Sequence, residues 1–291
     1  KHLGAASQAS DPMLTNKFAL YTSAHRGDGV AYLAMKWTLD EDSAEVWEKY
    51  SPSNVKALVQ GKKIYDPRLE VTAGGTAGAN PTTAAYVTYS TNPALCVTDY
   101  LIDQTLGMGI AASKINWAAV ITAANGCDVD VDVPNSATQK RFTANGVLFG
   151  TDSHQKNINK LLSAMNGRLI YSNGEYIVKA GIYEAPTEVL TEDDLIGAIQ
   201  IKTSLERSDR FNTIRGIFVD AAANNKSTEF PKVQLATAVT RDNGEVLEKE
   251  IQLPMVSDSY QAQRIANKLI QLSDQQKIIS FPANLSALRI T

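Results

Sequence analysis

The sequence predicts an α+β fold that is rich in β-structure. Alternating apolar and polar residues, typical of strands, occur toward both ends of the chain, and helical patterns with clear start and stop signals lie between residues 92 and 167. The order of these patterns contains no repeated β–α–β alternation. A doubly wound parallel sheet is therefore not expected.

Strands are predicted in the first quarter of the chain. Residues 30–39 form an alternating segment, and two more strands are expected at 55–60 and 64–66, joined by a short turn at 61–63 and ended by Pro67. Residues 72–85 contain no large apolar side chain and are predicted to form an exposed loop or domain boundary. The apolar residues that share one face of the first strand are Ala31, Leu33, Met35, Trp37 and Leu39.

Three helices are predicted in the middle of the chain. The first begins after the N-cap Asn92, with Pro93 at its first position, and stops near Gly107. The second covers residues 113–124. The third begins with a capping box formed by Asp152 and Gln155 and closes at Gly167. Its apolar face consists of Ile158, Leu161, Leu162 and Met165.

A hairpin and a second strand-rich region follow. Strands at 169–171 and 176–178 are joined by Asn173-Gly174, which suits a type I′ turn. One helix, 258–272, is expected to start with a capping box of Asp258 and Gln261 and to bury Ala262, Ile265, Ala266, Leu269 and Leu272. Further strands are expected at 214–219, 233–239, 246–253, 278–281 and 285–290, with a turn at 241–244 and core anchors at Phe211, Phe218 and Tyr260.

Composition excludes several classes of protein. Lys and Arg number 28 against 31 Asp and Glu, so the net charge of −3 argues against a nucleic-acid coat and against a polybasic membrane anchor. Two cysteines, Cys96 and Cys127, are expected to be buried thiols in a reducing compartment. The chain starts at Lys1 without Met, and we expect further sequence at both ends.

Candidate chemical sites each have a simpler structural interpretation. Asp128, Asp130 and Asp132 match the start of a calcium loop, but Val133 stands where the loop needs Gly and Gln139 where it needs Glu, so a solvated strand face is predicted.

Other polar groups are predicted to be structural as well. Residues 61–63 (Gly-Lys-Lys) are expected to form a turn, and Glu192, Asp193 and Asp194 the start of a short helix. The three histidines have no partner at metal-ligand spacing and are expected to be structural or solvent-facing. No catalytic, cofactor or metal site is therefore predicted; the histidines are His2, His25 and His154.

An ordered set of phrases covers the chain from about Leu14 to its C-terminus. These are residues 25–27 with 30–33, then 59–68, 90–101, 106–109, 140–146, 209–220 and 261–266. Taken together, they resemble the tail-tip hub proteins of lambda-type long-tailed bacteriophages, also called host-specificity or central tail fibre proteins. The loop at 73–85 is where members of that family usually differ.

The resemblance implies a trimeric ring at the distal end of the tail tube, which encloses the DNA channel, carries the receptor-binding fibre and gates DNA ejection. It implies barrel-like hub domains at residues 1–75 and 186–291, with an α+β insertion at 76–185, and no catalytic residues. Implied partners are two more copies of the chain, the distal tail and tape measure proteins, and a host receptor reached through regions outside this sequence. DNA would pass without specific binding, and the protein would reside at the virion's tail tip after assembly in the host cytoplasm.

Two other classes of function remain open at this point. A receptor-binding module predicts exposed aromatic residues at loop tips, whereas the loop at 73–85 has none. A glycan- or peptidoglycan-cleaving enzyme predicts two carboxylates about 5–10 Å apart or a zinc site.

Overall fold

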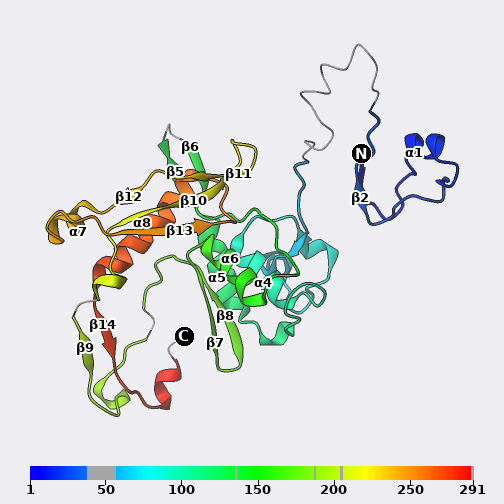
Figure 1. Cartoon of the computed structure of the whole chain (residues 1–291). Helices are drawn as coiled ribbons and strands as arrows, with labels where there is room; N and C mark the ends of the chain where they lie inside the picture. Colours follow the sequence, from blue (N-terminus) through cyan, green and yellow to red (C-terminus); the bar gives the residue numbers. More distant parts are fainter. Residues whose placement is uncertain (38–56, 135–136, 187, 204–205, 290–291) are drawn as a thin grey trace. The chain divides into compact units, whose positions relative to one another are not determined.

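The computed structural model describes residues 1–37, 57–134, 137–186, 188–203 and 206–289 (Figure 1). Its contacts divide the chain into two compact units, Lys1–Val59 and Gln60–Thr291. Each unit is described by itself below. The domain boundaries expected near residues 75 and 185 stay predictions.

The first unit is small and has a polar interior. Strands β1 (His2–Leu3) and β2 (Ala31–Tyr32) pair antiparallel, and Asp11 caps helix α1 (Pro12–Lys17). Gln8 ties the unit together, because its side-chain amide donates to the carbonyls of Gly27 and Val30. Among the described residues of this unit, the buried ones are Gln8 and Asp11, which are both polar.

The strand predicted at 30–39 is mostly wrong for the part that the structure describes. Only β2 is extended and paired, because its partner β1 is two residues long, and residues 33–37 form no strand. The side chains of Leu33, Met35 and Trp37 are exposed. Residues 38 and 39 lie outside the described residues.

Three helices form the centre of the second unit. Helix α4 (Pro93–Ile102) contacts both α5 (Trp117–Cys127) and α6 (His154–Ser163). The Asn92 side chain caps α4 as predicted, and it also donates to the carbonyl of Ala124 in α5 at 2.9 Å. The core that the helices share includes Leu95, Val97, Leu101, Val120, Ala124, Ile158, Leu161 and Met165.

The ends of these helices differ from the predictions. Helix α4 stops at Ile102 rather than near Gly107, because the Asp103 side chain accepts hydrogen bonds from the following amides of Thr105 and Leu106. Helix α5 begins after the cap Asn116, and residues 112–114 form the separate 3-10 turn η3 (Ala112–Lys114). The capping box of Asp152 and Gln155 is wrong, since Ser153 caps α6.

Two short elements differ from what the sequence predicted. Strand β3 (Ile64–Tyr65) pairs with β4 (Val87–Thr88), not with residues 57–60, which form no strand; residues 55 and 56 lie outside the described residues. Pro67 does end β3, and it also starts helix α3 (Pro67–Thr72), which Asp66 caps. The loop expected at residues 72–85 therefore begins with the last residue of α3 and runs into the 3-10 turn η2 (Ala84–Tyr86).

Two hairpins flank the helices. Strands β7 (Arg168–Ser172) and β8 (Glu175–Lys179) are joined by Asn173 and Gly174 with φ of 53° and 83°, which confirms the predicted turn of type I′. Strands β5 (Asp130–Val133) and β6 (Ala137–Lys140) form the second hairpin. Residues 135 and 136 lie outside the described residues.

A four-stranded sheet is built around β10 (Thr213–Asp220). Strand β13 (Glu248–Leu253) runs parallel along one edge of β10, and the antiparallel strands β11 (Lys226–Glu229) and β12 (Val233–Gln234) share the other edge. Helix α8 (Ser259–Gln275) contacts this sheet (Figure 1). The strands predicted at 214–219 and 246–253 are therefore confirmed. Buried side chains between the helix and the sheet are Ile214, Phe218, Leu253, Ala262, Ile265, Ala266 and Ile270.

Three expectations in this region are wrong. The strand expected at 233–239 ends at Gln234 and is followed by helix α7 (Ala236–Arg241), in which the Thr240 hydroxyl bonds the carbonyl of Ala236. Of the expected core anchors, Phe218 is buried and Phe211 packs against the core, whereas Tyr260 is exposed because it faces away from the sheet on α8. Leu272 is also exposed, and Ile270 takes the buried place on that helix.

The end of the chain forms a separate ribbon with an earlier segment. Strand β9 (Gln200–Lys202) pairs antiparallel with β14 (Ile278–Ser280), and a bridge joins Leu195 to Ala283. The last predicted strand is wrong, since residues 285–289 form the 3-10 turn η7 (Leu285–Arg289), started by the Asn284 side chain, which accepts from the amide of Ser286; residue 290 lies outside the described residues. Among the described residues, the strands form small antiparallel sheets and one mixed sheet without a closed barrel, so the fold is α+β.

Candidate functional site

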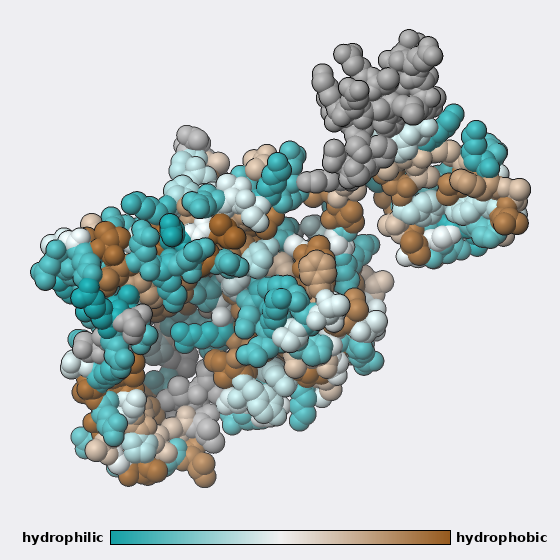
Figure 2. Space-filling model, in the orientation of Figure 1, coloured by the Kyte–Doolittle hydropathy of each residue, from teal (hydrophilic) through white to brown (hydrophobic). Residues whose placement is uncertain are grey.

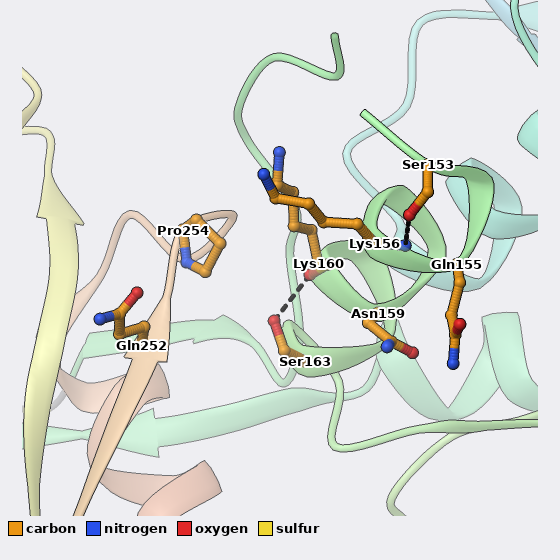
Figure 3. A pocket seen from close by; sticks show the side chains of 8 residues that line it. All are labelled: Ser153, Gln155, Lys156, Asn159, Lys160, Ser163, Gln252 and Pro254. Atoms are coloured by element: carbon orange, nitrogen blue, oxygen red, sulfur yellow. Dashed lines mark hydrogen bonds between the residues drawn. The ribbon is translucent and has the colours of Figure 1, made fainter. Parts of the chain in front are cut away.

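A groove of about 510 Å³, lined mainly by polar residue types, lies between helix α6 and the end of strand β13 (Figure 3). The helix contributes two lysines and several uncharged polar side chains from its exposed face, at spacings of three or four residues. The strand contributes Gln252, and Pro254 follows its last residue. The lining residues are Ser153, Gln155, Lys156, Asn159, Lys160, Ser163, Gln252 and Pro254.

Both lysines of the groove pair with one carboxylate, that of Asp152. Asp152 accepts from Lys156 Nζ at 2.7 Å and from Lys160 Nζ at 2.6 Å, and the two ammonium groups hold the pKa of Asp152 below its ordinary value. The Lys160 ammonium also lies 5.6 Å from the centre of the Phe149 ring. Because Asp152 makes these contacts, it is not available as the helix cap that the sequence predicted.

The groove can contact a polar ligand through its lysine, serine and amide side chains. Its lining residues include no carboxylate, imidazole or thiol. Amide and hydroxyl groups at its walls can donate and accept hydrogen bonds with a peptide backbone. Strand β13 next to it pairs with β10 only, so its second edge is unpaired within the described part of the chain.

A buried carboxylate organises the loop that follows α3. Glu70 is fully buried and accepts from Tyr65 Oη, from Asn80 Nδ2 at 2.7 Å and from the Asn80 amide at 3.3 Å. Burial by itself raises the pKa of Glu70, but these hydrogen bonds outweigh it, so the pKa lies below its ordinary value. The amide of Gly78 donates to Tyr65 Oη at 2.7 Å. The loop at 72–85, which the sequence predicted to be exposed, is therefore held by hydrogen bonds from Gly78 and Asn80 to the buried side chains of Tyr65 and Glu70.

The three aspartates of the calcium-like motif do not converge. Asp128 pairs with Arg68 at 2.7 Å, and Asp130 pairs with Lys140 at 2.9 Å. Asp130 and Asp132 lie on the exposed face of β5, as predicted, whereas Asp128 is partly buried. Among the residues that the structure describes, no group of three or more His, Cys, Asp or Glu side chains could hold a metal ion.

Each histidine has a local partner. His2 Nε2 lies 2.9 Å from Asp11 Oδ2, and the His2 ring stacks on Tyr32 with 4.4 Å between ring centres. His25 Nδ1 accepts from the amide of Thr22 at 3.0 Å. His154 Nδ1 lies 2.8 Å from Tyr100 Oη, so it links α6 to α4 rather than only facing solvent.

The remaining candidates also have structural contacts. The turn predicted at residues 61–63 is wrong, because no turn forms there; the Lys62 ammonium pairs with Asp99 on α4 at 2.8 Å and with Asp103, the residue that follows this helix. The acidic run at 192–194 was predicted to start a short helix. It forms the 3-10 turn η5 (Glu192–Asp194), with a capping box between Thr191 and Asp194. Cys96 and Cys127 are free thiols, and burial raises the pKa of each to about 12.

The Gln261 side chain has a role that the sequence did not predict, because it makes four hydrogen bonds to residues outside its own helix. Asp258 caps α8 as predicted, but the Gln261 side chain does not complete a capping box. It accepts from the amide and hydroxyl of Thr143 at 3.2 and 3.0 Å, and it donates to the carbonyls of Thr143 and Ala164, both at 2.8 Å. Gln261 therefore joins α8 to the end of α6, and only its place at N3 of a helix was visible in the sequence.

No described helix combines the length and apolar character needed to cross a membrane.

Comparisons with known proteins give one family match. Residues 153–291 match the family model described as a putative phage tail protein. No curated protein matches the chain. Among solved structures, the chain is similar to the prophage tail protein gp18 from Listeria monocytogenes EGD-e, at 16% sequence identity and a TM-score of 0.26. That similarity covers 51% of this chain and 43% of the other, so the chain spans less than half the length of that structure. The family match supports a structural role in a phage tail.

Proposed function

We propose that this chain is a structural hub of a bacteriophage tail tip. In this proposal three copies form a ring that closes the distal end of the tail tube, carries the receptor-binding fibre and gates the passage of DNA. The match of residues 153–291 to the phage tail family carries the proposal. The ordered resemblance of the sequence to tail-tip hubs supplies the finer assignment to the tip.

The roles of the resembling phrases support a shape-forming protein. Within 209–220, Asn212 is buried, and its side-chain amide donates to Asp242 and to the carbonyl of Glu245, both at 2.9 Å. Within 140–146 and 261–266, Thr143 and Gln261 bond each other. These phrases hold elements together, and none of them supplies catalytic chemistry to the groove.

The proposal includes the architecture, partners and location of the hub. Its strand-rich regions would take part in barrel-like hub domains that are completed in the assembled tail. The ring would contact the distal tail and tape measure proteins, and the host receptor would be reached through other parts of the particle. The protein would have no enzymatic activity and no bound cofactor, would reside at the tail tip of the virion after assembly in the host cytoplasm, and would let DNA pass without specific binding.

Electron microscopy of phage particles tests the location. Gold-labelled antibodies raised against residues 60–291 should bind only at the distal end of the tail, and quantitative mass spectrometry should give three chains per particle. A peptidoglycan zymogram of the purified protein should show no clearing. Labelling along the tube or on the head, or six or more chains per particle, would contradict the hub assignment.

A further inference from the structure

The outer edge of strand β13 is open. Just before the strand, the carbonyl of Leu247 accepts from the amide of Thr213 in β10 at 3.1 Å, so Leu247 directs its backbone toward β10. Because alternate residues of a strand direct their backbone groups to the same side, the amides and carbonyls of Glu248, Glu250 and Gln252 point away from β10. All three residues are exposed, and within the described part of the chain β13 has no second neighbour.

The charged side chains of β13 leave this edge unguarded. Sheet edges are commonly protected from pairing by charged side chains. Here the Lys249 ammonium lies 4.5 Å from the centre of the Phe211 ring, and Glu248 pairs with Arg215 on β10 at 3.6 Å. Both side chains are therefore engaged by β10 or by the segment that leads into it. Among the described residues, the carboxylate of Glu250 has no ion-pair partner.

The groove of α6 continues this edge with the opposite charge. Gln252 near the end of β13 lies on one side of the groove, and Lys156 and Lys160 lie on the other (Figure 3). Only the Asp152 carboxylate pairs with these two ammonium groups, so one positive charge is in excess. The Lys156 side chain is 61% exposed and open to a second carboxylate. A molecule lying along the edge would therefore pass from the negative charge of Glu250 to a positively charged groove.

We propose that the free edge of β13 and the groove of α6 bind an extended segment of another protein, which adds a strand to the sheet. The main chain of the segment pairs with the outward amides and carbonyls of β13. A basic side chain of the segment lies beside Glu250, and an acidic one lies in the groove beside Lys156. Both are on the same face of the added strand, because alternate side chains of a strand share a face.

A partner of this mixed charge fits the surface better than a second copy of the chain. Two copies of β13 paired antiparallel about Glu250 would place glutamate opposite glutamate, which is destabilising. In the view of Figure 2, hydrophilic side chains predominate over the four-stranded sheet, which favours a polar partner. The inference goes beyond the proposed hub function, since strand addition depends neither on the number of copies nor on the position in the tail.

Fluorescence polarisation on the full chain tests this with two labelled peptides, TEVEVKVKT and TKVKVEVET. They carry the complementary charges in the two possible strand directions, and one of them should bind with a Kd below about 500 µM. This peptide is then N-methylated either at all its charged positions or at all its valines. Since only alternate amides of an added strand face the sheet, one of the two methylated forms should lose about tenfold or more in affinity and the other should not.

Variants of the protein locate the contact. Lys156→Glu should weaken peptide binding by about tenfold, whereas Lys232→Glu, an equal charge change at an exposed lysine outside the groove, should not. Circular dichroism checks that both variants are folded. Hydrogen exchange should show that the bound peptide protects residues 248–254 and 153–163 but not 226–234.

The same measurements can overturn the inference. It is wrong if neither peptide binds at about 1 mM, if the two methylated forms bind equally, or if the two lysine variants bind equally. It is also wrong if residues 248–254 become protected through self-association without any peptide, because the edge would then belong to a second copy. Each of these results leaves the hub assignment intact, since antibody labelling of the particles tests that separately.

Discussion

The side chain of Gln261 shows how much a single buried amide contributes when it serves several elements. Replacement by Ala leaves the amide and carbonyl of Thr143 and the carbonyl of Ala164 without this partner. We expect Gln261→Ala to lower the free energy of unfolding by about 2–4 kcal/mol, because buried groups that lose their partners each cost about 1–3 kcal/mol. Urea denaturation monitored by circular dichroism measures this.

Gln263 provides the control for this prediction. It lies on the same helix, but among the described residues its side chain bonds only to Ser259 in the preceding turn. Gln263→Ala should therefore change the free energy of unfolding by less than about 1 kcal/mol. Equal losses in the two variants would show that the contacts of Gln261 with Thr143 and Ala164 contribute little.

The buried Glu70 carboxylate should make the stability of the folded state depend on pH. Its pKa in the folded state lies below the unfolded value of about 4.3, so its contribution to stability is present above that value and is lost as the pH falls through the folded pKa. The melting temperature of the wild type should exceed that of Glu70→Gln at pH 7, and the difference should shrink between pH 5 and pH 3.

Differential scanning fluorimetry at pH 7, 5, 4 and 3 measures this difference. Glu206→Gln is a suitable control, because Glu206 is exposed and, within the part of the chain that the structure describes, its side chain pairs only with Lys202, at 3.4 Å. Its melting temperature should stay close to that of the wild type throughout. A difference between wild type and Glu70→Gln that does not change with pH would mean that the carboxylate does not act through its charge.

Between elements, the approach of β13 to β10 depends on a glycine. A Cβ atom at Gly216 would lie 2.0 Å from the carbonyl oxygen of Ile251, so a side chain there forces the parallel strand away. Gly216→Ala should lower the free energy of unfolding by about 1–3 kcal/mol or more, as overpacking does. Chemical denaturation measures this. Gly61→Ala is the control, since a Cβ atom at Gly61 would meet nothing within 4 Å and the change should be small.

An alanine substitution should lower the free energy of unfolding more in helix α6 than in the turn of the β7–β8 hairpin. Leu161 is buried in the helical core, so Leu161→Ala should cost about 2–5 kcal/mol through lost burial and a cavity. Asn173 has a positive φ in an exposed turn, so Asn173→Ala should cost about 1 kcal/mol. Chemical denaturation ranks the two variants. If the turn variant were folded normally yet blocked tail assembly more strongly than Leu161→Ala, the hairpin tip would be a contact surface.

The sequence was informative where local chemistry decides the structure. Asn92 with Pro93, Asn173 with Gly174, and Asp258 each set a helix start or a turn within a few residues, and these predictions are confirmed. Where an element pairs with residues distant in the sequence, the local pattern did not predict the pairing. Strand β3 pairs with β4 rather than with its neighbour.

The candidate site depended on the same kind of distant contact. The groove brings together α6 and β13, which are about ninety residues apart. No local spacing encodes that proximity. The sequence assigned Asp152 to the helix cap, but its bonds to two lysines compete with capping, and Ser153 caps the helix instead. The polar side chains of the groove were therefore visible in the sequence only as the solvent-facing side of an amphipathic helix.

At the scale of the whole chain, the division into two units predicts what can be removed. Among the described residues, the apolar core contains no member before Ile64, and the unit Lys1–Val59 buries only polar side chains. Protein that begins at Gln60 should therefore fold and melt within about 3 °C of the full chain, because its core is complete. Circular dichroism and calorimetry measure this.

A second truncation, starting at residue 76, tests where the boundary lies. It removes β3 and α3, and with them the buried residues Ile64, Tyr65 and Glu70, so β4 loses its partner and α5 loses the contact with α3. Loss of two large buried apolar side chains costs several kcal/mol, which is a large fraction of the stability of an ordinary domain. This protein should melt at least 10 °C below the one that begins at Gln60 or fail to fold. Equal melting temperatures would instead favour the boundary near residue 75 that the sequence suggested, with β3 and α3 belonging to the first unit.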